Sequence, residues 1–424
     1  MRILLLSTTT GYQLRSFGDA AERLGVDLML GTDRCHRLDD PWRDGAIAVR
    51  FHEEEASLAA VLEATKDRPL SGVLAVGDRP TPLAARVCEA LRLPGNPAHA
   101  AEASRNKRLM RQRFASAGLA IPWFVEVPHG ADLHTVAARI RYPCVVKPIG
   151  LSGSRGVIRA DNPGQFEYAG ERVRALLARP DVRAQRSELN DALLVERFID
   201  GREFAIEGLL TRGALSVLAI FDKPDPLDGP YFEETIYVTP AALSPNTERA
   251  ILETLQRATA ALGLVHGPIH AECRVTPTGV VMLEVAARPI GGLCSKALRF
   301  QAPGEDDTLP LEELLLRHAT GDDVSEYTRE KQAAGVMMIP IPQRGMLRRV
   351  SGEERARDVP NLEDLRITAK QDQLLEPLPE GDCYLGFIFA RAPATDEVVA
   401  ALREGHRRLE FHIDPEIRVR SLRS

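Results

Sequence analysis

Two glutamates are placed by a predicted β-hairpin at a spacing that can hold a divalent cation. Glu272 and Glu284 each lie in an apolar, alternating run, and a Thr-Pro-Thr-Gly turn at 276–279 joins the two runs. They are 284 − 272 = 12 residues apart, so we expect them opposite or diagonal on one face. Two inward-facing carboxylates repel each other unless a cation lies between them. Mg²⁺ suits this geometry because it takes one or two carboxylates and completes its octahedron with phosphate oxygens and water, and Mn²⁺ is also compatible.

An arginine and two glycines follow the second of these strands. Arg288 comes 288 − 284 = 4 residues after Glu284, where its guanidinium can bind a phosphate or a carboxylate in a bidentate manner. Gly291 and Gly292 indicate that the backbone approaches a ligand closely. The alternative is a surface arginine before a loop, which the neighbouring acids make less favoured.

A second group of residues has the composition of a phosphate-binding loop. A β-rich run ends near Lys147, and the loop after it contains Ser152, Gly153, Ser154 and Gly156. Glycines let backbone N–H groups approach anionic oxygens, serines add hydroxyl donors, and the lysine supplies positive charge. The loop lacks the G-K-[ST] of a Walker A motif. Alone it fits an ordinary hairpin turn equally well, and the preceding lysine favours phosphate binding.

A third segment, 193–208, combines apolar and acidic residues. A strand that carries Glu196, Phe198 and Ile199 is followed by an Asp-Gly turn, and a second strand begins at Glu203. An edge or hinge strand of this kind can offer backbone donors and acceptors to a purine, and its acids can accept hydrogen bonds from ribose hydroxyls. Taken alone, the segment fits a solvated hairpin better.

The composition excludes several other classes of function. The 424 residues carry 54 Lys and Arg against 60 Asp and Glu, a net charge of −6, which argues against nucleic acid as the main partner. No apolar run approaches the ~20 residues of a membrane span, and the apolar start at 3–6 is too short for a signal peptide. The six cysteines lie far apart without a C-x-x-C pair, which favours reduced thiols in a cytoplasmic protein.

Other elements must position these residues. Over 1–97, apolar runs alternate with segments of helical spacing, which predicts a parallel sheet covered by helices. Such sheets bind ligands at the carboxyl ends of their strands. The pattern further predicts one helix over 98–118 and an edge or terminal strand over 334–341, because Pro340 and Pro342 are tolerated only there.

Taken in order, these motifs resemble the ATP-grasp superfamily over nearly the whole chain. The matching positions are Gly95-Asn96-Pro97, Lys107, Pro122, Val146-Lys147-Pro148, Ser152-Gly153-Ser154, Gly156, Glu196, Phe198-Ile199, Gly201, Glu203, Glu272 and Glu284. The resemblance implies an α/β ATP-grasp fold with an N-terminal parallel-sheet (Rossmann-like) domain at 1–97 and a two-lobed nucleotide-clamping region at 98–325. The small lobe of that region lies at about 135–205, and a C-terminal α+β cap follows at 326–424.

The resemblance also implies how ATP is held. Lys107 and Lys147 would contact the phosphates, with Lys147 near the adenine as well. Residues 152–156 would form the mobile loop over the β- and γ-phosphates. Residues 196–199 would form the adenine hinge, and Glu203 would bind the ribose hydroxyls.

Within the superfamily, the run at 284–288 resembles the dipeptide-forming L-amino-acid ligases of the bacilysin type. The resemblance implies that Glu272 and Glu284 hold magnesium and that Arg288 stabilises an acyl phosphate and the tetrahedral intermediate. The acid-x-Asn motif of many ATP-grasp enzymes is missing, because Ala286 occupies the last position.

The substrate positions resemble those of the same ligases, with two departures. His270 fits their pattern, and Glu234 takes the place of an acid near the amino-acid substrate. Tyr237 stands where the relatives carry histidine. Gly292, after Gly291, stands where such a ligase can carry a bulky specificity residue, which implies a larger pocket here.

These observations predict an ATP-dependent carboxylate–amine ligase that forms an amide or peptide bond through an acyl phosphate and releases ADP and phosphate. The partners expected are a small-molecule carboxylate and an amine, drawn from amino acids or small carboxylic acids, and the resemblance implies a homodimer. Three alternatives stay open: a purine-pathway ligase of the glycinamide ribonucleotide type, a non-catalytic ATP-binding module, and a phosphotransferase that forms no amide.

Overall fold

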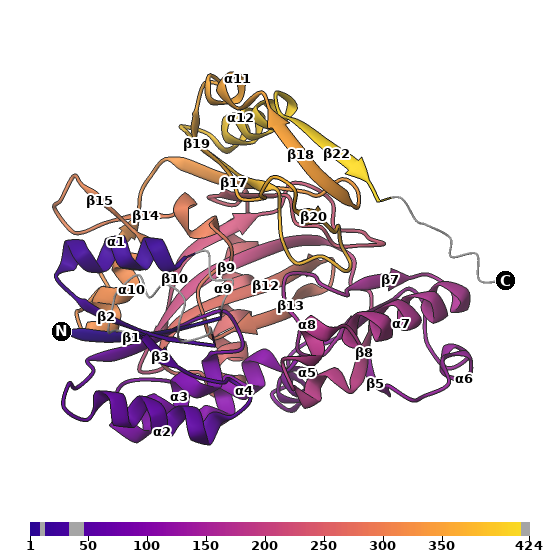
Figure 1. Ribbon diagram of the computed structural model, residues 1–424, viewed down its shortest axis with the longest axis horizontal. Coiled ribbons are helices and arrows are strands. Elements are labelled where there is room, and N and C mark those ends of the chain that lie inside the picture. Colours follow the sequence, from indigo (N-terminus) through magenta and orange to yellow (C-terminus); the bar gives the residue numbers. More distant parts are fainter. Residues whose placement is uncertain (9–12, 34–45, 417–424) are drawn as a thin grey trace.

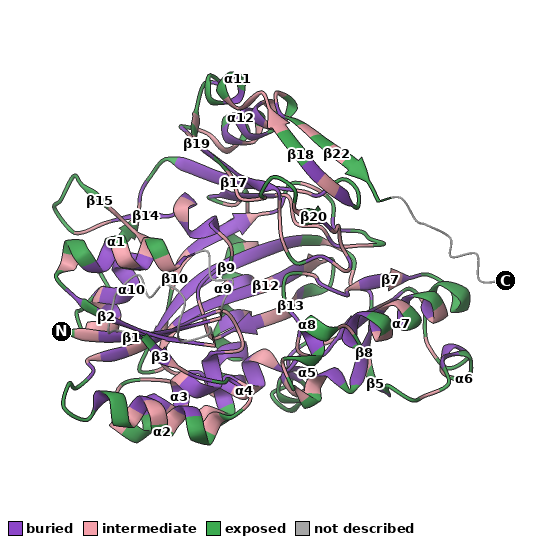
Figure 2. Cartoon of the chain, in the orientation of Figure 1, coloured by how far each residue is buried: buried purple, intermediate pink, exposed green. Residues whose placement is uncertain are grey.

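The computed structural model of the protein describes residues 1–8, 13–33 and 46–416. An N-terminal α/β region, a small lobe and a C-terminal part surround a large central sheet (Figure 1). The strands of that sheet are buried, whereas helices at the periphery are exposed on their outer faces (Figure 2).

The N-terminal region is a parallel sheet with helices, as the sequence predicts. Its elements are β1 (Arg2–Ser7), α1 (Leu14–Leu24), β2 (Asp27–Thr32), β3 (Ala46–Ala48), α2 (Glu54–Thr65), β4 (Gly72–Val76) and α3 (Thr81–Leu91). The strands pair in parallel in the order β3-β2-β1-β4. Leu5 of β1 lies between Leu30 and Leu74. A parallel strand buried on both faces needs a continuous apolar run, which β1 supplies.

The single helix predicted over 98–118 is wrong, because two helices occupy this segment. They are α4 (Ala98–Arg105) and α5 (Lys107–Ser116). Asn106 separates them in an extended conformation, and its side chain accepts a hydrogen bond from the N–H of Leu109. An Asn that caps a helix offers the backbone an alternative to continuing the preceding one. The break makes Lys107 the first residue of α5.

The small lobe is a four-stranded antiparallel sheet covered by one long helix. Its elements are β5 (Phe124–Pro128), α6 (Leu133–Ala137), β6 (Cys144–Pro148), β7 (Ile158–Ala160), α7 (Pro163–Leu177), α8 (Pro180–Arg183), the 3-10 helix η1 (Glu188–Asn190) and β8 (Ala192–Arg197). The strand order is β5-β8-β6-β7. Helix α7 packs Phe166, Val173 and Leu177 into the core of the lobe.

The segment 193–208 is neither a hairpin nor a sheet edge. Strand β8 is an interior strand of the small lobe, while β9 (Arg202–Thr211) belongs to the central sheet. Residues 198–201 therefore connect two sheets, so the expected edge strand and hairpin are wrong, and the adenine hinge at 196–199 stays a prediction.

The central sheet has eight strands. They are β9, β10 (Ala214–Asp222), β11 (Ile236–Thr239), β12 (Gly267–Thr276), β13 (Gly279–Ala286), β17 (Ala333–Ile339), β19 (Leu362–Ile367) and β21 (Gly386–Ala392), in the order β13-β12-β9-β10-β11-β17-β21-β19. Helix α9 (Pro245–Leu262) places Ile251, Leu255 and Leu262 in the core beside β12 and β13. Helix α12 (Thr395–Arg407) covers β17 and β21.

Strand β17 is not the edge strand that the sequence predicts. It lies between β11 and β21, and it ends at Ile339, so Pro340 and Pro342 follow the strand and remove no ladder hydrogen bond from it. The sheet thus continues across residue 325, where the sequence places a domain boundary.

Smaller elements complete the fold. They are the 3-10 helix η2 (Cys294–Ala297), β14 (Arg299–Gln301), β15 (Thr308–Pro310), α10 (Leu311–Thr320), β16 (Thr328–Arg329), β18 (Gly345–Ser351), α11 (Glu353–Arg357), β20 (Leu374–Leu375) and β22 (Glu410–Pro415). The described cysteines are all free thiols: Cys88, Cys144, Cys273, Cys294 and Cys383. Cys35 lies outside the described residues. Among the described helices, none combines the length and apolar character that crossing a membrane requires.

A buried histidine, His318, stacked on a half-buried one makes stability depend on pH. The rings of His266 and His318 stack at 4.5 Å, and His318 Nε2 lies 2.9 Å from the hydroxyl of Thr211. Burial and the neighbouring His266 lower the pKa of His318 to about 4. Between pH 6.5 and 4, His318 therefore binds a proton in the unfolded chain but not in the folded chain. Its contribution to the free energy of unfolding is complete above pH 6.5 and is lost as the pH falls toward 4.

We expect His318→Gln to remove about 2 kcal/mol of this pH dependence. The measurement is the free energy of unfolding in urea between pH 7 and pH 4.5 for both proteins. The carboxylates titrate in both, so the difference between the two curves isolates the histidine. Parallel curves would show that His318 titrates normally.

Candidate active site

A cavity of about 380 Å³ opens where the N-terminal region, the small lobe and the central sheet meet. Every site residue predicted from the sequence except Gly156 lines it: Lys107, Lys147, Ser152, Gly153, Ser154, Glu196, Phe198, Ile199, Glu203, Glu234, His270, Glu272, Glu284, Arg288, Gly291 and Gly292. Thr8, Gln13, Asp78 and Arg274 also line it, and sequence reasoning missed them.

Gly156 shapes the loop and does not line the cavity. Its φ is +75°, and a Cβ there would lie 2.8 Å from Pro148 and 2.9 Å from Leu176. Its N–H donates to the carbonyl of Pro379 at 2.7 Å. A glycine is therefore required at this turn for both conformation and space.

The two predicted phosphate-binding lysines reach the cavity from different elements. Lys107 donates to the carbonyl of Leu151 at 2.7 Å and lies 3.3 Å from Glu284. Lys147, at the end of β6, forms a 2.5 Å ion pair with Glu196. Burial lowers the pKa of Lys147, and Glu196 opposes that effect.

Glu196 is held by a buried cation, Arg111, that no sequence motif singles out. Arg111 of α5 is fully buried, forms a 2.7 Å ion pair with Glu196 and donates to the carbonyl of Leu283 at 2.8 Å. Burial would raise the pKa of Glu196, but Arg111 and Lys147 outweigh it and hold the pKa low. The Glu196 carboxylate is thus engaged, and so are the N–H groups of Arg197 and Phe198, which donate to the carbonyls of Trp123 and Pro143 at 3.0 and 3.1 Å.

Replacing Arg111 should destabilise the protein strongly. Arg111→Met leaves the buried Glu196 with one cation, and breaking a buried ion pair by removing one partner costs about 3 kcal/mol or more. Arg108→Met is the control, because Arg108 pairs with Glu126 at a half-exposed position and should cost below about 1 kcal/mol. Urea unfolding of both variants is the measurement, and equal small losses would contradict the assignment.

An aromatic pair and a buried arginine line the hinge side of the cavity. Phe198 and Phe232 stack with centroids 6.2 Å apart. Arg274 lies 2.9 Å from Glu203 and donates to the carbonyl of Ile199 at 2.6 Å. Arg274 follows His270 and Glu272 at every second position of β12, so the three side chains lie on one face of the strand. Polar residues that alternate in an otherwise apolar strand are the sequence signal that could have identified Arg274.

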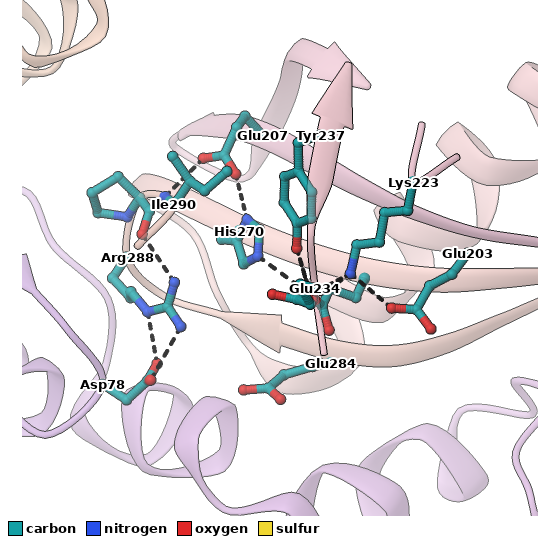
Figure 3. Close-up of polar contacts among 12 residues, drawn as sticks. Asp78, Glu203, Glu207, Lys223, Glu234, Tyr237, His270, Glu284, Arg288 and Ile290 are labelled. Carbon is teal, nitrogen blue, oxygen red and sulfur yellow. Dashed lines mark hydrogen bonds and ion pairs between the residues drawn. The ribbon is translucent and has the colours of Figure 1, made fainter. Parts of the chain in front are cut away.

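Three carboxylates converge on one lysine. The ammonium of Lys223 lies 2.7 Å from Glu203, 2.6 Å from Glu234 and 2.9 Å from Glu272 (Figure 3). The hydroxyl of Tyr237 donates to Glu234 at 2.8 Å. Burial raises the pKa of Glu234 to about 7 against the pull of Lys223, and Glu272 adds to the rise. Burial would also raise the pKa of Glu272, but Lys223 and His270 hold it well below its usual range.

Glu272 and Glu284 are directly opposite each other, as predicted. They form a register pair of β12 and β13, and a bulge places Leu283 out of register beside them. In a separate group, ligand oxygens of Glu203, Glu234 and Glu272 lie within 4.8 Å of one another. Hard carboxylate oxygens from neighbouring strands are the donors that Mg²⁺ prefers, so the residues present fit such an ion.

Arg288 is paired with a carboxylate of the N-terminal region. Its Nε and Nη2 donate to the two oxygens of Asp78 at 2.9 and 3.1 Å. Burial raises the pKa of Asp78, but Arg288 and Lys107 outweigh it and keep the carboxylate charged. Asp78 is the second residue after β4, at the carboxyl edge where parallel sheets bind ligands.

A second buried pair supports the backbone beyond Arg288. His270 Nδ1 contacts Glu207 Oε1, and the other oxygen of Glu207 accepts from the N–H of Ile290 at 3.1 Å. Burial lowers the pKa of His270, but the neighbouring Glu207 carboxylate outweighs burial and raises the pKa to about 9. Gly292 follows with φ +62°, where a Cβ would lie 3.1 Å from the ring of Phe387.

Ion pairs hold the small lobe against a loop of the C-terminal part. Arg155 donates to the carbonyl of Glu380 at 2.9 Å, and Arg172 donates to its carboxylate at 2.8 Å. Arg179 and Glu376 pair at 2.6 Å. The small-residue loop is therefore anchored through Arg155 to the C-terminal part, whose residues Asp382 and Tyr384 also line the cavity.

Family models match three stretches of the chain. An ATP-grasp N-terminal domain matches 18–95, an ATP-grasp domain matches 140–297, and L-amino acid ligase C-terminal domain 2 matches 337–414. These matches, with the sheets described above, confirm the predicted ATP-grasp fold with an N-terminal domain.

Known proteins are similar over different lengths. The crystal structure of an L-amino acid ligase from Bacillus licheniformis has a TM-score of 0.81 and 29% identity, and covers 97% of this chain and 98% of that one. Alanine–anticapsin ligase of Bacillus subtilis is 28% identical over 49% of this chain and 46% of its own length. Dapdiamide A synthase of Enterobacter agglomerans is 27% identical over 56% of this chain and 55% of its own length. The chain thus spans about half the length of these two curated relatives.

Proposed function

This chain is an ATP-grasp ligase similar to the L-amino acid ligases, and from that premise we propose that it joins two amino acids, or an amino acid and a small carboxylic acid, through an amide bond. ATP would be converted to ADP and phosphate in the same cycle. The observation that carries the proposal is that two lysines, an opposed pair of carboxylates and an arginine line one cavity between the lobes.

The first step transfers the γ-phosphoryl group to a carboxylate. A carboxylate oxygen of the first substrate attacks the γ-phosphorus, and the bond to the β–γ bridging oxygen breaks, which gives ADP and an acyl phosphate. Lys107 and Lys147 neutralise the phosphates from two sides. A divalent ion held by Glu272 and Glu284 would shield the phosphate charge further. Such a reaction depends on positioning and charge neutralisation, so it needs no covalent nucleophile from the protein.

The second step forms the amide. The neutral amine of the second substrate attacks the acyl carbon, the tetrahedral intermediate collapses, and the carbon–oxygen bond to phosphate breaks. The proton that the nitrogen loses is taken up by the departing phosphate or by water. Arg288 stabilises the negative charge that develops on the carbonyl and phosphate oxygens. Its buried position in the cavity strengthens this interaction.

The substrates lie against the acidic cluster and the paired glycines. Glu234 binds the ammonium group of an amino-acid substrate, and His270 fixes the neighbouring Glu272 from 3.8 Å. Gly291 has open space around its Cβ position, and Gly292 contributes no side chain, so they leave room for a substrate side chain. Phe198, Ile199 and Glu203 receive the adenosine.

We also propose a homodimer that works in the cytoplasm, by the resemblance and by the free thiols of the described cysteines. Light scattering of the purified protein tests the dimer.

A screen of ADP release over pairs of amino acids, with mass spectrometry of the products, tests the proposed function. The expected result is one pair, or a small set, that gives ADP, phosphate and a dipeptide in equal amounts. Turnover only with glycine and a phosphorylated ribosylamine would favour the purine-pathway alternative. A phosphorylated product without amide would favour a phosphotransferase, and ATP binding without release under any pair would favour a non-catalytic module.

A further inference from the structure

We propose that Asp78 and Gln13 form an N-terminal clamp that positions Arg288 and the backbone after it for amide formation. The N-terminal region is then a working part of the active site. The inference rests on the proposed function for the role of Arg288, and it concerns two positioning residues that do not themselves touch the reacting atoms.

The first contact of the clamp fixes the guanidinium in its plane. Asp78 binds Arg288 in a fork with distances of 2.9 and 3.1 Å, across 210 residues of sequence. Each side chain is 11% exposed, so the pair is largely shielded from water. A buried bidentate pair of this kind restricts both the position and the rotation of the arginine.

The donors of Arg288 show which edge the clamp leaves for a ligand. A guanidinium has five N–H donors. Asp78 takes one on Nε and one on Nη2, and the carbonyl of Pro289 takes one on Nη1 at 3.0 Å. Within the described residues, one N–H on each terminal nitrogen is left over. These two donors form the tip of the fork, which matches an oxyanion in a bidentate manner.

The second contact of the clamp fixes the backbone that carries the arginine. The buried side-chain amide of Gln13 donates to the carbonyl of Ile290, and the N–H of the same residue donates to Glu207 at 3.1 Å. The peptide at Ile290 is therefore held by the N-terminal region on one side and by β9 on the other. Gln13 immediately precedes α1 and Asp78 follows β4, so both come from the carboxyl edge of the N-terminal sheet.

The competing interpretation is that the Asp78–Arg288 pair only stabilises the contact between the N-terminal region and the rest of the chain. The protein contains a matched control for that role. Arg23 of α1 pairs with Glu313 of α10 at 3.1 Å, which also joins the N-terminal region to the rest of the chain. Neither residue lines the cavity. Arg23→Gln removes such a tie without touching the clamp.

The first experiment compares Asp78→Asn, Asp78→Glu and Arg23→Gln in steady-state kinetics with the full chain. Asp78→Asn should lower kcat about 100-fold, because the substitution lets Arg288 move, and a small displacement of a catalytic group can reduce the rate by that factor. The KM for ATP should rise less than kcat falls, since Asp78 also acts on Lys107 and Ser152 but leaves Lys147 in place. Asp78→Glu should recover part of kcat by restoring the charge, and Arg23→Gln should behave as wild type.

A mutant cycle tests whether Asp78 acts through Arg288. Adding Asp78→Asn to Arg288→Met should cause no further loss, because the group that the clamp positions is already absent. An equal loss in both backgrounds would overturn the proposal, and so would a wild-type kcat in Asp78→Asn alone.

Hydrogen exchange tests the clamp without any activity. Amides in a peptide that covers 286–292 should exchange faster in Asp78→Asn and in Gln13→Leu, and at the wild-type rate in Arg23→Gln. Unchanged exchange in both clamp variants would overturn the proposal. If the wild type forms no amide with any pair while exchange changes as expected, the proposed function fails and the clamp stands.

Discussion

Arg288→Met is expected to reduce amide formation by roughly 10²- to 10³-fold, or about 3–4 kcal/mol of transition-state stabilisation. The variant should bind ATP as the wild type does, because Lys107 and Lys147 remain in the cavity. Charge develops on the acyl carbonyl and the departing phosphate during the second step, and a preorganised guanidinium stabilises that charge most in a buried site.

Two further variants separate this effect from damage to the fold. Arg288→Met leaves Asp78 as a buried carboxylate without its bidentate partner, which is destabilising by itself. Arg288→Met combined with Asp78→Asn removes both charges and should restore stability but not ligation. Arg299→Ala, which breaks an ion pair with Glu363 outside the cavity, should leave the rate unchanged. Full product formation by the double variant would remove Arg288 from the mechanism.

Glu284→Gln is expected to weaken the binding of the divalent ion by about 10- to 100-fold and to lower the rate of ADP release in proportion. An amide keeps the volume of the carboxylate but loses the charge that a hard cation needs. The direct measurement is binding of Mn²⁺ with a non-hydrolysable ATP analogue, followed by a Mg²⁺ titration of turnover.

The same measurement distinguishes two places for the ion. Glu234→Gln alters the second group of converging carboxylates, formed by Glu203, Glu234 and Glu272, and should leave metal affinity near that of the wild type. Glu126→Gln on the exposed face of β5 is the control for charge alone. Loss of the ion in Glu234→Gln, with full affinity in Glu284→Gln, would move the metal to the group around Lys223.

Local patterns identified the parts of the site that are close in sequence. The register pair Glu272 and Glu284 was predictable because a four-residue turn fixes both strands and the alternation fixes the face. The place of the small-residue loop at the cavity was predictable from its glycines and serines together with the preceding Lys147. The parallel N-terminal sheet followed from its buried apolar runs.

Contacts between distant segments were not predictable from one sequence. Asp78 lies 210 residues from Arg288, and Arg111 lies 85 residues from Glu196, so no spacing rule connects them. The expected hairpin at 200–201 was wrong because the chain leaves one sheet and enters another there, which strand propensity does not reveal. Asn106 carried a usable signal, since an Asn inside a helical run favours a cap over helix interior.

The route through an acyl phosphate is tested most directly by following oxygen-18 from the carboxylate substrate. With both carboxylate oxygens labelled, we expect one labelled oxygen in the released phosphate and one in the amide for each bond formed. Phosphate without label, with both labelled oxygens still on the carboxylate, would show that water and not the substrate attacks ATP, and would contradict the proposed ligation.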